Sequence, residues 1–579
     1  MKTAMCPLDL DHVWQWTTDT PMIVYLLCLV LLPVATVATL ATVTNTPPHP
    51  NILFFLVDDG GFESPVWGNP VISTPHISAL AHSGTLFQRA YTAVSSCSPS
   101  RSAILSGLPT HQNGMYGLHQ NPGNFQSNAD ITSVPNLLNQ AGYKTGIIGK
   151  HHVGPLANFN FTYGTDASYC WAGALGNPMN FGNDVTCHAE YNQVTRNLTN
   201  MKLNTREFLS LEPTQPFFLY IGFGDVHRCK YKSPIGSFCE FYGSGKTNQG
   251  MQFPTIEDWP TPAFYTPAEV IVPPYLPDTD SVREDIAGQY TAWDRLDTGV
   301  GVIMNELTRA KVLNTTLVVF FSDNGIPFPA AKTNLFEVGQ HEPLIVSTPS
   351  SRSEGVGHTS EVVVSSLDLA PTLLDWAGVA YPRNARARGA PAHLTGKSLL
   401  PLLKNSGKNR EDKNREDKDR EDEDREDEDR AAYGSHQFHS LYAYYPMRSM
   451  VTTQYRLIHN LNYNLKYPIL EDVFGTDTWT DIERLGEQGN DHPNGWALNY
   501  TTYMFRPEWQ LFDVVQDPLC LDNLALNGSF AKTLRGMQGR LRQWQQDTSD
   551  PWLGCNPAVP NGLSKQEEWS TTHSETCSF

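Results

Sequence analysis

The stretch NILFFLVDDG, residues 51–60, decides the fold class, because it joins an apolar run to a polar end. A continuous apolar run of this length is typical of a strand that is buried on both faces of a sheet. Similar runs occur at residues 143–149, 217–223, 316–325 and 344–349. We therefore expect a large sheet whose strands are covered on both sides.

The segments between these runs have helical patterns. Residues 74–81 begin with Thr and Pro, which is a helix-start signal, and a further helix is expected at residues 134–141. Before residue 316, apolar residues recur at intervals of three and four: Trp293, Leu296, Val300, Ile303 and Leu307. Strands that alternate with helices predict an α/β fold, with a mainly parallel sheet sandwiched by helices.

The pattern changes near the C-terminus. Short strand-like pieces appear at residues 455–460 and 509–515, and a final helix has Leu534, Met537, Leu541 and Trp544 on one face. These features predict a smaller C-terminal α+β subdomain with an antiparallel sheet, at residues 431–579, following a catalytic domain at residues 50–403.

Composition and charge restrict the function. The chain has 579 residues, 40% of them hydrophobic and 17% charged, which excludes a mostly disordered or fibrous protein. Residues 404–430 hold 13 acidic and 9 basic residues, so this tract contributes only −4 to the net charge of −19. We interpret the tract as a low-complexity charged insert that is solvated. The acidic remainder lacks the basic footprint that nucleic-acid binding needs.

Polar side chains follow four of the predicted strands. In parallel α/β sheets, ligands bind beyond the carboxyl ends of the strands. Three carboxylates and an amide among these side chains suit a hard cation such as Ca²⁺ or Mg²⁺, although DDG and SDNG also occur as simple turns. The strand-end residues are Asp58, Asp59, Lys150, His152, Asp225, His227, Asp323 and Asn324.

A cysteine motif, SSCSPSRSAILSG, occupies residues 95–107. Cys97 stands just ahead of Pro99 and an apolar helical run, which places it near a helix N-terminus. Such a position favours bound anions and lowers the pKa of a thiol. From the residues alone, Cys97 is either a nucleophile or a buried structural cysteine.

The run Cys97-Ser-Pro-Ser-Arg101 resembles the C-x-P-S-R signature of the sulfatase family, whose members have an alkaline-phosphatase-like fold. The resemblance extends from about residue 51 to the C-terminus and is interrupted only by the charged tract. Within the family, the chain is most similar to the sulfamidases. The stretches that carry the resemblance are VDDGGFES (57–64), HQNGMYGLHQ (111–120), TGIIGKHHVGP (145–155), SDNGIPFP (322–329), YPMRSM (445–450) and YRLIHNLN (455–462).

The resemblance implies a role for each site residue. In this family the cysteine is oxidised to Cα-formylglycine, so Cys97 would become the nucleophile, and its oxygen would join a cation, Ca²⁺ rather than Mg²⁺. Arg101 would stabilise the formylglycine hydrate, His152 would contact its hydroxyl as a base, and His227 would protonate the departing nitrogen. The implied metal ligands are Asp58, Asp59, Cys97, Asp323 and Asn324, and the residues around the sulfo group are Lys150, His227 and Lys332.

The implied activity is removal of the N-linked sulfate from terminal N-sulfoglucosamine residues of heparan sulfate or heparin. A formylglycine-generating enzyme during maturation and a homodimer are further implied partners. Alternatives are an exo-O-sulfatase, a phosphoesterase and a non-catalytic sulfatase-like protein on a membrane. Three departures from sulfamidases bear on specificity: Lys332 stands in place of Arg, Gly224 in place of His, and Val226 in place of Pro.

The N-terminal region, residues 1–49, indicates the secretory route. Residues 22–43 form an apolar run that is long enough to span a bilayer, and small residues near Ala41 fit a cleavage site. A cleaved signal peptide is the favoured interpretation, and an uncleaved membrane anchor is the alternative. Together with this route, the resemblance to sulfamidases implies a location in the lysosome, with secretion or membrane anchoring as alternatives.

Sequons and cysteines agree with this route. Glycosylation sequons occur at Asn160, Asn197, Asn314, Asn499 and Asn527. Local disulfides are expected between Cys229 and Cys239 and between Cys555 and Cys577. Cys6 and Cys28 lie in or before the apolar run, and Cys170 and Cys187 are a candidate third pair, which leaves Cys97 and Cys520 unpaired.

Overall fold

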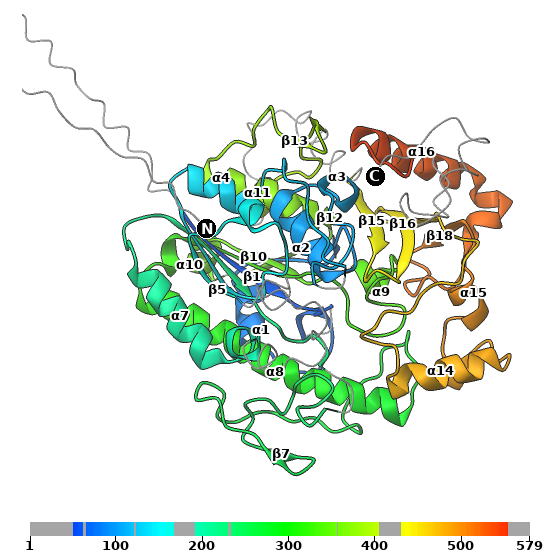
Figure 1. The fold of residues 1–579 in the computed structure, drawn as a ribbon, viewed down its shortest axis with the longest axis horizontal. Helices are drawn as coiled ribbons and strands as arrows, with labels where there is room; N and C mark the ends of the chain where they lie inside the picture. The colour runs from blue at the N-terminus through cyan, green and yellow to red at the C-terminus, as the bar shows by residue number, and fades with distance from the viewer. Residues whose placement is uncertain are drawn as a thin grey trace, which may run out of the picture. The chain divides into compact units, whose positions relative to one another are not determined.

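The computed structural model describes residues 50–61, 65–120, 123–166, 191–229, 233–355, 357–404 and 430–553. Its largest sheet has eight strands in the order β11-β2-β10-β9-β1-β6-β4-β5 (Figure 1). These strands are β1 (Asn51–Val57), β2 (Thr85–Phe87), β4 (Lys144–Gly149), β5 (Tyr163–Asp166), β6 (Phe217–Gly222), β9 (Thr316–Ser322), β10 (Leu344–Ser347) and β11 (His358–Ser360).

The sheet is mainly parallel, as predicted. Strand β1 lies at its centre, parallel to β6 on one side and to β9 on the other. Only β10 runs antiparallel to its neighbours, β9 and β2. The carboxyl ends of β9, β1, β6 and β4 therefore meet at one edge.

Helices cover both faces of this sheet, and side chains of β1 alternate between them. Leu53 and Phe55 pack with α1 (Pro75–His82), α7 (Leu198–Ser210) and α8 (Asp280–Arg309). On the other face, Ile52, Phe54 and Leu56 pack with α2 (Cys97–Ser106), α4 (Val134–Gln140) and α11 (Leu369–Ala377). The two helical layers in Figure 1 follow from this period-two alternation.

A second sheet confirms the expected antiparallel part near the C-terminus. It consists of β15 (Ala432–Phe438), β16 (Tyr444–Val451), β17 (Tyr455–Asn460) and β18 (Trp509–Asp513). Helix α16 (Ala531–Asp547) packs Met537, Leu541 and Trp544 against this sheet. Shorter elements include α3 (Thr110–Asn113), α9 (Glu337–Gln340), α10 (Pro349–Glu354), α12 (Leu400–Lys404), α14 (Asp477–Glu487) and α15 (Tyr500–Met504). The proposed boundaries around residues 404–430 stay predictions, because most of this tract lies outside the described residues.

Some of the residues on which the secretory-route predictions rest lie in the described part of the structure. Cys229 and Cys239 form a disulfide, while Cys97 and Cys520 are buried and unpaired. The apolar run at residues 22–43 lies outside the described residues, as do Cys170, Cys187, Cys555 and Cys577. Within the described ranges, none of the helices combines the length and apolar character needed to cross a bilayer.

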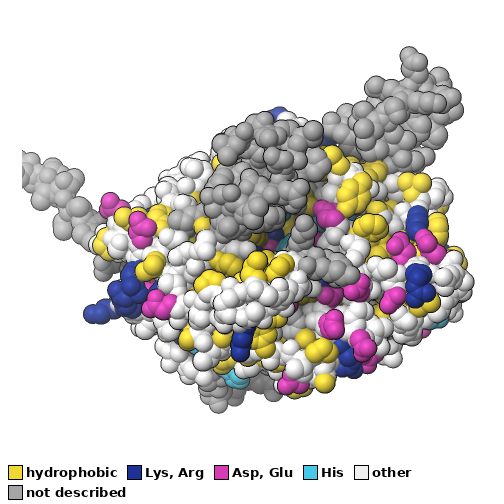
Figure 2. Space-filling view, turned by 60° about the horizontal axis from the view of Figure 1, so that its bottom comes forward, with side chains coloured by type: hydrophobic (Ala, Val, Ile, Leu, Met, Phe, Trp, Pro, Cys, Tyr) yellow, Lys and Arg dark blue, Asp and Glu magenta, His cyan; other side chains and the backbone are white. Residues whose placement is uncertain are grey.

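The surface agrees with the charge and glycosylation predictions. On the face in Figure 2, Lys and Arg side chains of the described residues are scattered among acidic ones. The sequon residues Asn160, Asn314 and Asn527 are exposed, and Asn197 and Asn499 are half-buried. All five are therefore at positions from which a glycan could extend, and their modification stays a prediction.

Candidate active site

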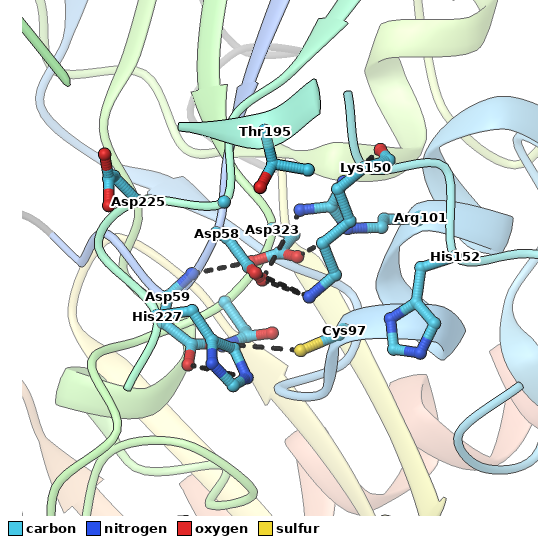
Figure 3. Close-up of polar contacts among 12 residues, drawn as sticks. Asp58, Asp59, Cys97, Arg101, Lys150, His152, Thr195, Asp225, His227 and Asp323 are labelled. Atoms are coloured by element: carbon cyan, nitrogen blue, oxygen red, sulfur yellow. Dashed lines mark hydrogen bonds and ion pairs between the residues drawn. The ribbon is translucent and has the colours of Figure 1, made fainter. Parts of the chain in front are cut away.

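The structure brings the predicted strand-end residues together at one edge of the main sheet. Asp58 and Asp59 follow β1, Lys150 follows β4, and Asp323 follows β9. Figure 3 shows Lys150, Cys97 and His227 converging around the two aspartates. Ligand atoms of Asp58, Asp59, Cys97 and His227 all lie within 4.8 Å of one another. Residues that are as far apart in sequence as 58 and 323 thus form one buried polar cluster.

Asp58 is held by two cations. Lys150 Nζ lies 2.6 Å from both carboxylate oxygens of Asp58, and Arg101 Nη2 lies 3.5 Å from Oδ1. Burial by itself would raise the pKa of Asp58, but the surrounding cationic groups, Lys150 first among them, together outweigh burial and hold the pKa well below its usual range. Asp58 is therefore a carboxylate, as metal binding requires.

Asp59 adopts a backbone conformation with positive φ, 59°, that turns it toward the cluster. Its oxygens accept hydrogen bonds from Asn324 Nδ2 at 2.7 Å and Lys332 Nζ at 2.9 Å. Among the described residues, Asn324 Oδ1 is buried and has no hydrogen-bond partner. A buried amide oxygen that lacks a partner beside carboxylates is a donor set that suits a hard divalent cation.

Asp323 completes the acidic cluster. It accepts hydrogen bonds from Arg101 Nε at 2.8 Å and from the backbone N–H of Asp59 at 3.0 Å. Burial raises the pKa of Asp323 to about 6, with Arg101 opposing the rise and Asp58 adding to it. A divalent cation would relieve this repulsion between carboxylates. The predicted ligand residues thus fit a cation, and the assignment of each as a ligand stays a prediction.

Cys97 is the first residue of α2, as the motif predicts. Its Sγ lies 3.7 Å from Asp59 Oδ1, and the residue is buried. The expectation of a lowered thiol pKa is wrong: burial raises the pKa of Cys97 well above its usual value, and Lys150 and Lys332 oppose the rise only in part. A buried thiol with a raised pKa is a poor nucleophile, which favours the modified side chain as the reactive form of residue 97.

The two predicted histidines lie in different surroundings. His227 Nδ1 lies 2.6 Å from the Arg228 carbonyl oxygen, and Nε2 lies 3.7 Å from Asp59 Oδ2. His152 contacts Gln120 through Nε2, and burial, with the charge of Lys150, holds its pKa well below the usual value. His152 is therefore neutral, which is the state that a base requires.

The loop that carries His227 is fixed by a buried ion network. Asp225 Oδ1 and Oδ2 accept hydrogen bonds from Arg295 at 2.7 and 2.8 Å, and Arg196 Nε donates to Oδ1 at 2.9 Å. Glycine at position 224, where sulfamidases have histidine, fits its surroundings, because a Cβ there would lie 2.6 Å from Thr195 Oγ1. The side chain that sulfamidases carry here does not fit unless Thr195 moves.

Two site residues escaped the sequence analysis. Asp472 precedes α14 and accepts a hydrogen bond from Lys332 Nζ at 2.6 Å. His439 follows β15, and its Nδ1 lies 2.9 Å from the Ser96 hydroxyl. Both come from the C-terminal part, where the sequence analysis predicted no strand directly before either residue.

Comparison with known proteins identifies the family. A family model described as Sulfatase matches residues 50–379. The human N-sulphoglucosamine sulphohydrolase is 42% identical over 518 residues, which cover 89% of this chain and 93% of the relative. The chain belongs to the sulfatase family. A second relative of this sulfatase, the N-acetylglucosamine-6-O-sulfatase of Bacteroides thetaiotaomicron, is 24% identical over 90% of this chain and 91% of its own.

Solved structures confirm the predicted alkaline-phosphatase-like sulfatase fold. A protein solved in complex with its substrate D-glucosamine-2-N,6-O-disulfate has a TM-score of 0.54 at 19% identity, covering 87% of this sulfatase and 98% of that chain. The phosphonate monoester hydrolase of Agrobacterium radiobacter has a TM-score of 0.52 at 17% identity, covering 86% and 96%. Such distant likeness shows the fold, and the choice of reaction depends on the site.

Proposed function

We propose that this sulfatase removes the N-linked sulfo group from terminal N-sulfoglucosamine residues of heparan sulfate or heparin-derived chains. The observation that carries the proposal is the near full-length similarity to the human N-sulphoglucosamine sulphohydrolase. The cluster around Cys97 supports it, since cations and carboxylates gather where an anionic group would react.

Asp58, Asp59, Asp323 and Asn324 would hold a cation, Ca²⁺ in preference to Mg²⁺, together with an oxygen of the modified residue 97. The ion would supply charge neutralisation for the sulfo group and acidify a hydroxyl of formylglycine. Ca²⁺ is preferred because three carboxylates and an amide oxygen supply the many hard oxygen ligands that it takes.

The cationic side chains would bind the sulfo group. Lys150 and Lys332 are buried, and each is paired with an aspartate at 2.6 and 2.9 Å respectively. Burial would lower the pKa of Lys332, but Asp472 and Asp59 outweigh it and raise the pKa well above its usual value. Both lysines therefore stay charged and can offset the negative charge that moves during cleavage.

His227 would donate the proton that the departing substrate nitrogen needs. An amide-like nitrogen is a poor leaving group unless it is protonated as the S–N bond breaks. His227 Nε2 faces the cluster, because Nδ1 points to the Arg228 carbonyl oxygen. Its side chain is 23% exposed, so it can exchange protons with solvent between turnovers.

The remaining partners and the location follow from the same proposal. Oxidation of Cys97 requires a formylglycine-generating enzyme, and the cysteine is free for this modification because it forms no disulfide. We propose a lysosomal location reached through the secretory pathway, and a homodimer.

Two measurements test the function. Mass spectrometry of the peptide that contains residue 97 is expected to show formylglycine, and unmodified cysteine in active protein would overturn the mechanism. Sulfate release from N-sulfoglucosamine is expected to exceed release from 6-O-sulfated glucosamine. The opposite ranking would favour the second candidate, an exo-O-sulfatase, which the similarity to the N-acetylglucosamine-6-O-sulfatase supports.

A further inference from the structure

Asp472 places a fourth carboxylate beside a pocket that has to accept an anion. It lies in the segment between β17 and α14, and its side chain is 16% exposed. Oδ2 lies 2.6 Å from Lys332 Nζ and 3.9 Å from His227 Nε2. A negative charge at this position would repel a sulfo group, so its presence calls for an explanation beyond sulfo binding.

The surroundings of Asp472 link it to the reacting residues. His439 Nε2 lies 3.8 Å from Oδ2, and its Nδ1 contacts Ser96, the residue before Cys97. Burial would raise the pKa of Asp472, but Lys332, with help from His227 and His439, lowers it. In the described part of the chain, no hydrogen bond reaches Oδ1. Asp472 therefore offers a charged acceptor that is fixed through one oxygen and available through the other.

Asp472 lies near the group that would protonate the leaving atom. Its Oδ2 is 3.9 Å from Nε2 of His227, the proposed proton donor, so a nitrogen that receives a proton from His227 would also lie near Asp472. A sulfamate nitrogen carries one hydrogen and can donate it to a carboxylate. The bridging oxygen of a sulfate ester has only lone pairs and would face the carboxylate unfavourably.

We propose that Asp472 accepts the N–H of the substrate sulfamate and thereby selects a nitrogen-linked over an oxygen-linked sulfo group. This inference rests on the proposed function and adds a specificity-determining residue to it. As an oxygen of the modified residue 97 bonds to sulfur, the S–N bond breaks, its electron pair stays on nitrogen, and His227 transfers a proton to that pair. The nitrogen leaves as an amine with two hydrogens, one of which still points at Asp472.

The test compares N-sulfoglucosamine with glucose 2-sulfate, which replaces the N–H by an oxygen. Asp472→Asn is expected to reduce the preference for N-sulfoglucosamine by roughly 100-fold, because a site built to accept an N–H loses its discrimination when the acceptor is changed. Preference is measured as the kcat/KM for N-sulfoglucosamine divided by the kcat/KM for glucose 2-sulfate. If glucose 2-sulfate is not hydrolysed, its inhibition constant is compared with the KM for N-sulfoglucosamine. Asp472→Glu, which keeps a carboxylate, is expected to retain more of the preference than Asp472→Asn.

The matched control is Glu471→Gln, which makes the same charge change at the neighbouring residue. Glu471 accepts hydrogen bonds from Ser440 and Tyr442 instead of Lys332, so its variant is expected to keep the preference within twofold. An equal loss on both substrates in Asp472→Asn would mean that Asp472 acts only through Lys332, and would overturn the inference. A wild-type protein that does not hydrolyse N-sulfoglucosamine would instead overturn the proposed function.

Discussion

The edge of the main sheet and the C-terminal part contribute to the site in different ways. Asp58, Asp59 and Asp323 at the sheet edge are fully buried and are held by backbone turns and cations. Asp472 from the C-terminal part is partly exposed, and within the described residues a hydrogen bond holds only one of its oxygens. This difference fits the two roles proposed above, with sulfo chemistry at the sheet edge and contact with the leaving group at the C-terminal part.

The largest expected effect comes from Cys97→Ser at the sheet edge. A serine that is not oxidised to the aldehyde would offer no second hydroxyl to release sulfate, so turnover should fall by roughly 10⁴-fold or more. Thermal unfolding should stay close to wild type, because the residue is buried and the change is nearly isosteric. Steady-state turnover near wild type would contradict the role of the second hydroxyl.

Removal of the cation should affect the edge of the main sheet and leave the second sheet unchanged. A chelator is expected to abolish sulfate release and to lower Tm, since loss of an ion present at 100 times its Kd costs about 2.7 kcal/mol of stability. Hydrogen exchange should increase around Asp59 and Asn324 and stay unchanged in β16 and β17. Added Ca²⁺ should restore activity more fully than Mg²⁺. An unchanged Tm and activity after chelation would rule out a metal site here.

Asp225→Asn tests how the main sheet positions His227. The change leaves Arg196 and Arg295 buried beside a neutral group, and breaking a buried pair costs about 3–5 kcal/mol. Denaturant unfolding measures the loss. Asp278→Asn is the control, since it breaks an exposed pair with Arg283 and should leave stability unchanged. Similar stability of both variants would mean that the network does not support the loop.

The smallest expected effect concerns the pH dependence of the contact between α3 and the C-terminal part. Burial lowers the pKa of His111 to about 3, below the ordinary 6.5, so the unfolded chain binds a proton in this interval and the folded protein does not. Stability should therefore fall as pH drops from about 6.5 toward 3, by about 1 kcal/mol per pH unit for this histidine.

His111→Gln should flatten this dependence. His111 contacts Ser435 on β15 and Thr548 after α16, so the measurement is urea unfolding between pH 7 and 4, with His82→Gln on the exposed end of α1 as the control. An unchanged pH slope in His111→Gln would show that the buried imidazole is protonated in the folded protein.

Much of the main sheet and its site was predictable, because the signals are local. The apolar runs predict β1, β6 and β9, and a strand that ends in DDG or SDNG places its carboxylates at the sheet edge. The Cys97 motif predicts the start of α2 for the same reason. The raised thiol pKa was not predictable, because it depends on burial by segments that are distant in sequence.

The sequence by itself determined the α/β fold, the strand-end cluster and the cysteine motif, since periodicity and turn chemistry act over a few residues. Only the tertiary structure decided that Lys332 is shared by Asp59 and Asp472, and that His439 reaches Ser96. Asp472 and His439 belong to the C-terminal part, whereas Lys332 and Ser96 belong to the part that contains the main sheet. The formation of these contacts depends on how the second sheet packs against the first, and the spacing of residues along the chain does not encode that packing.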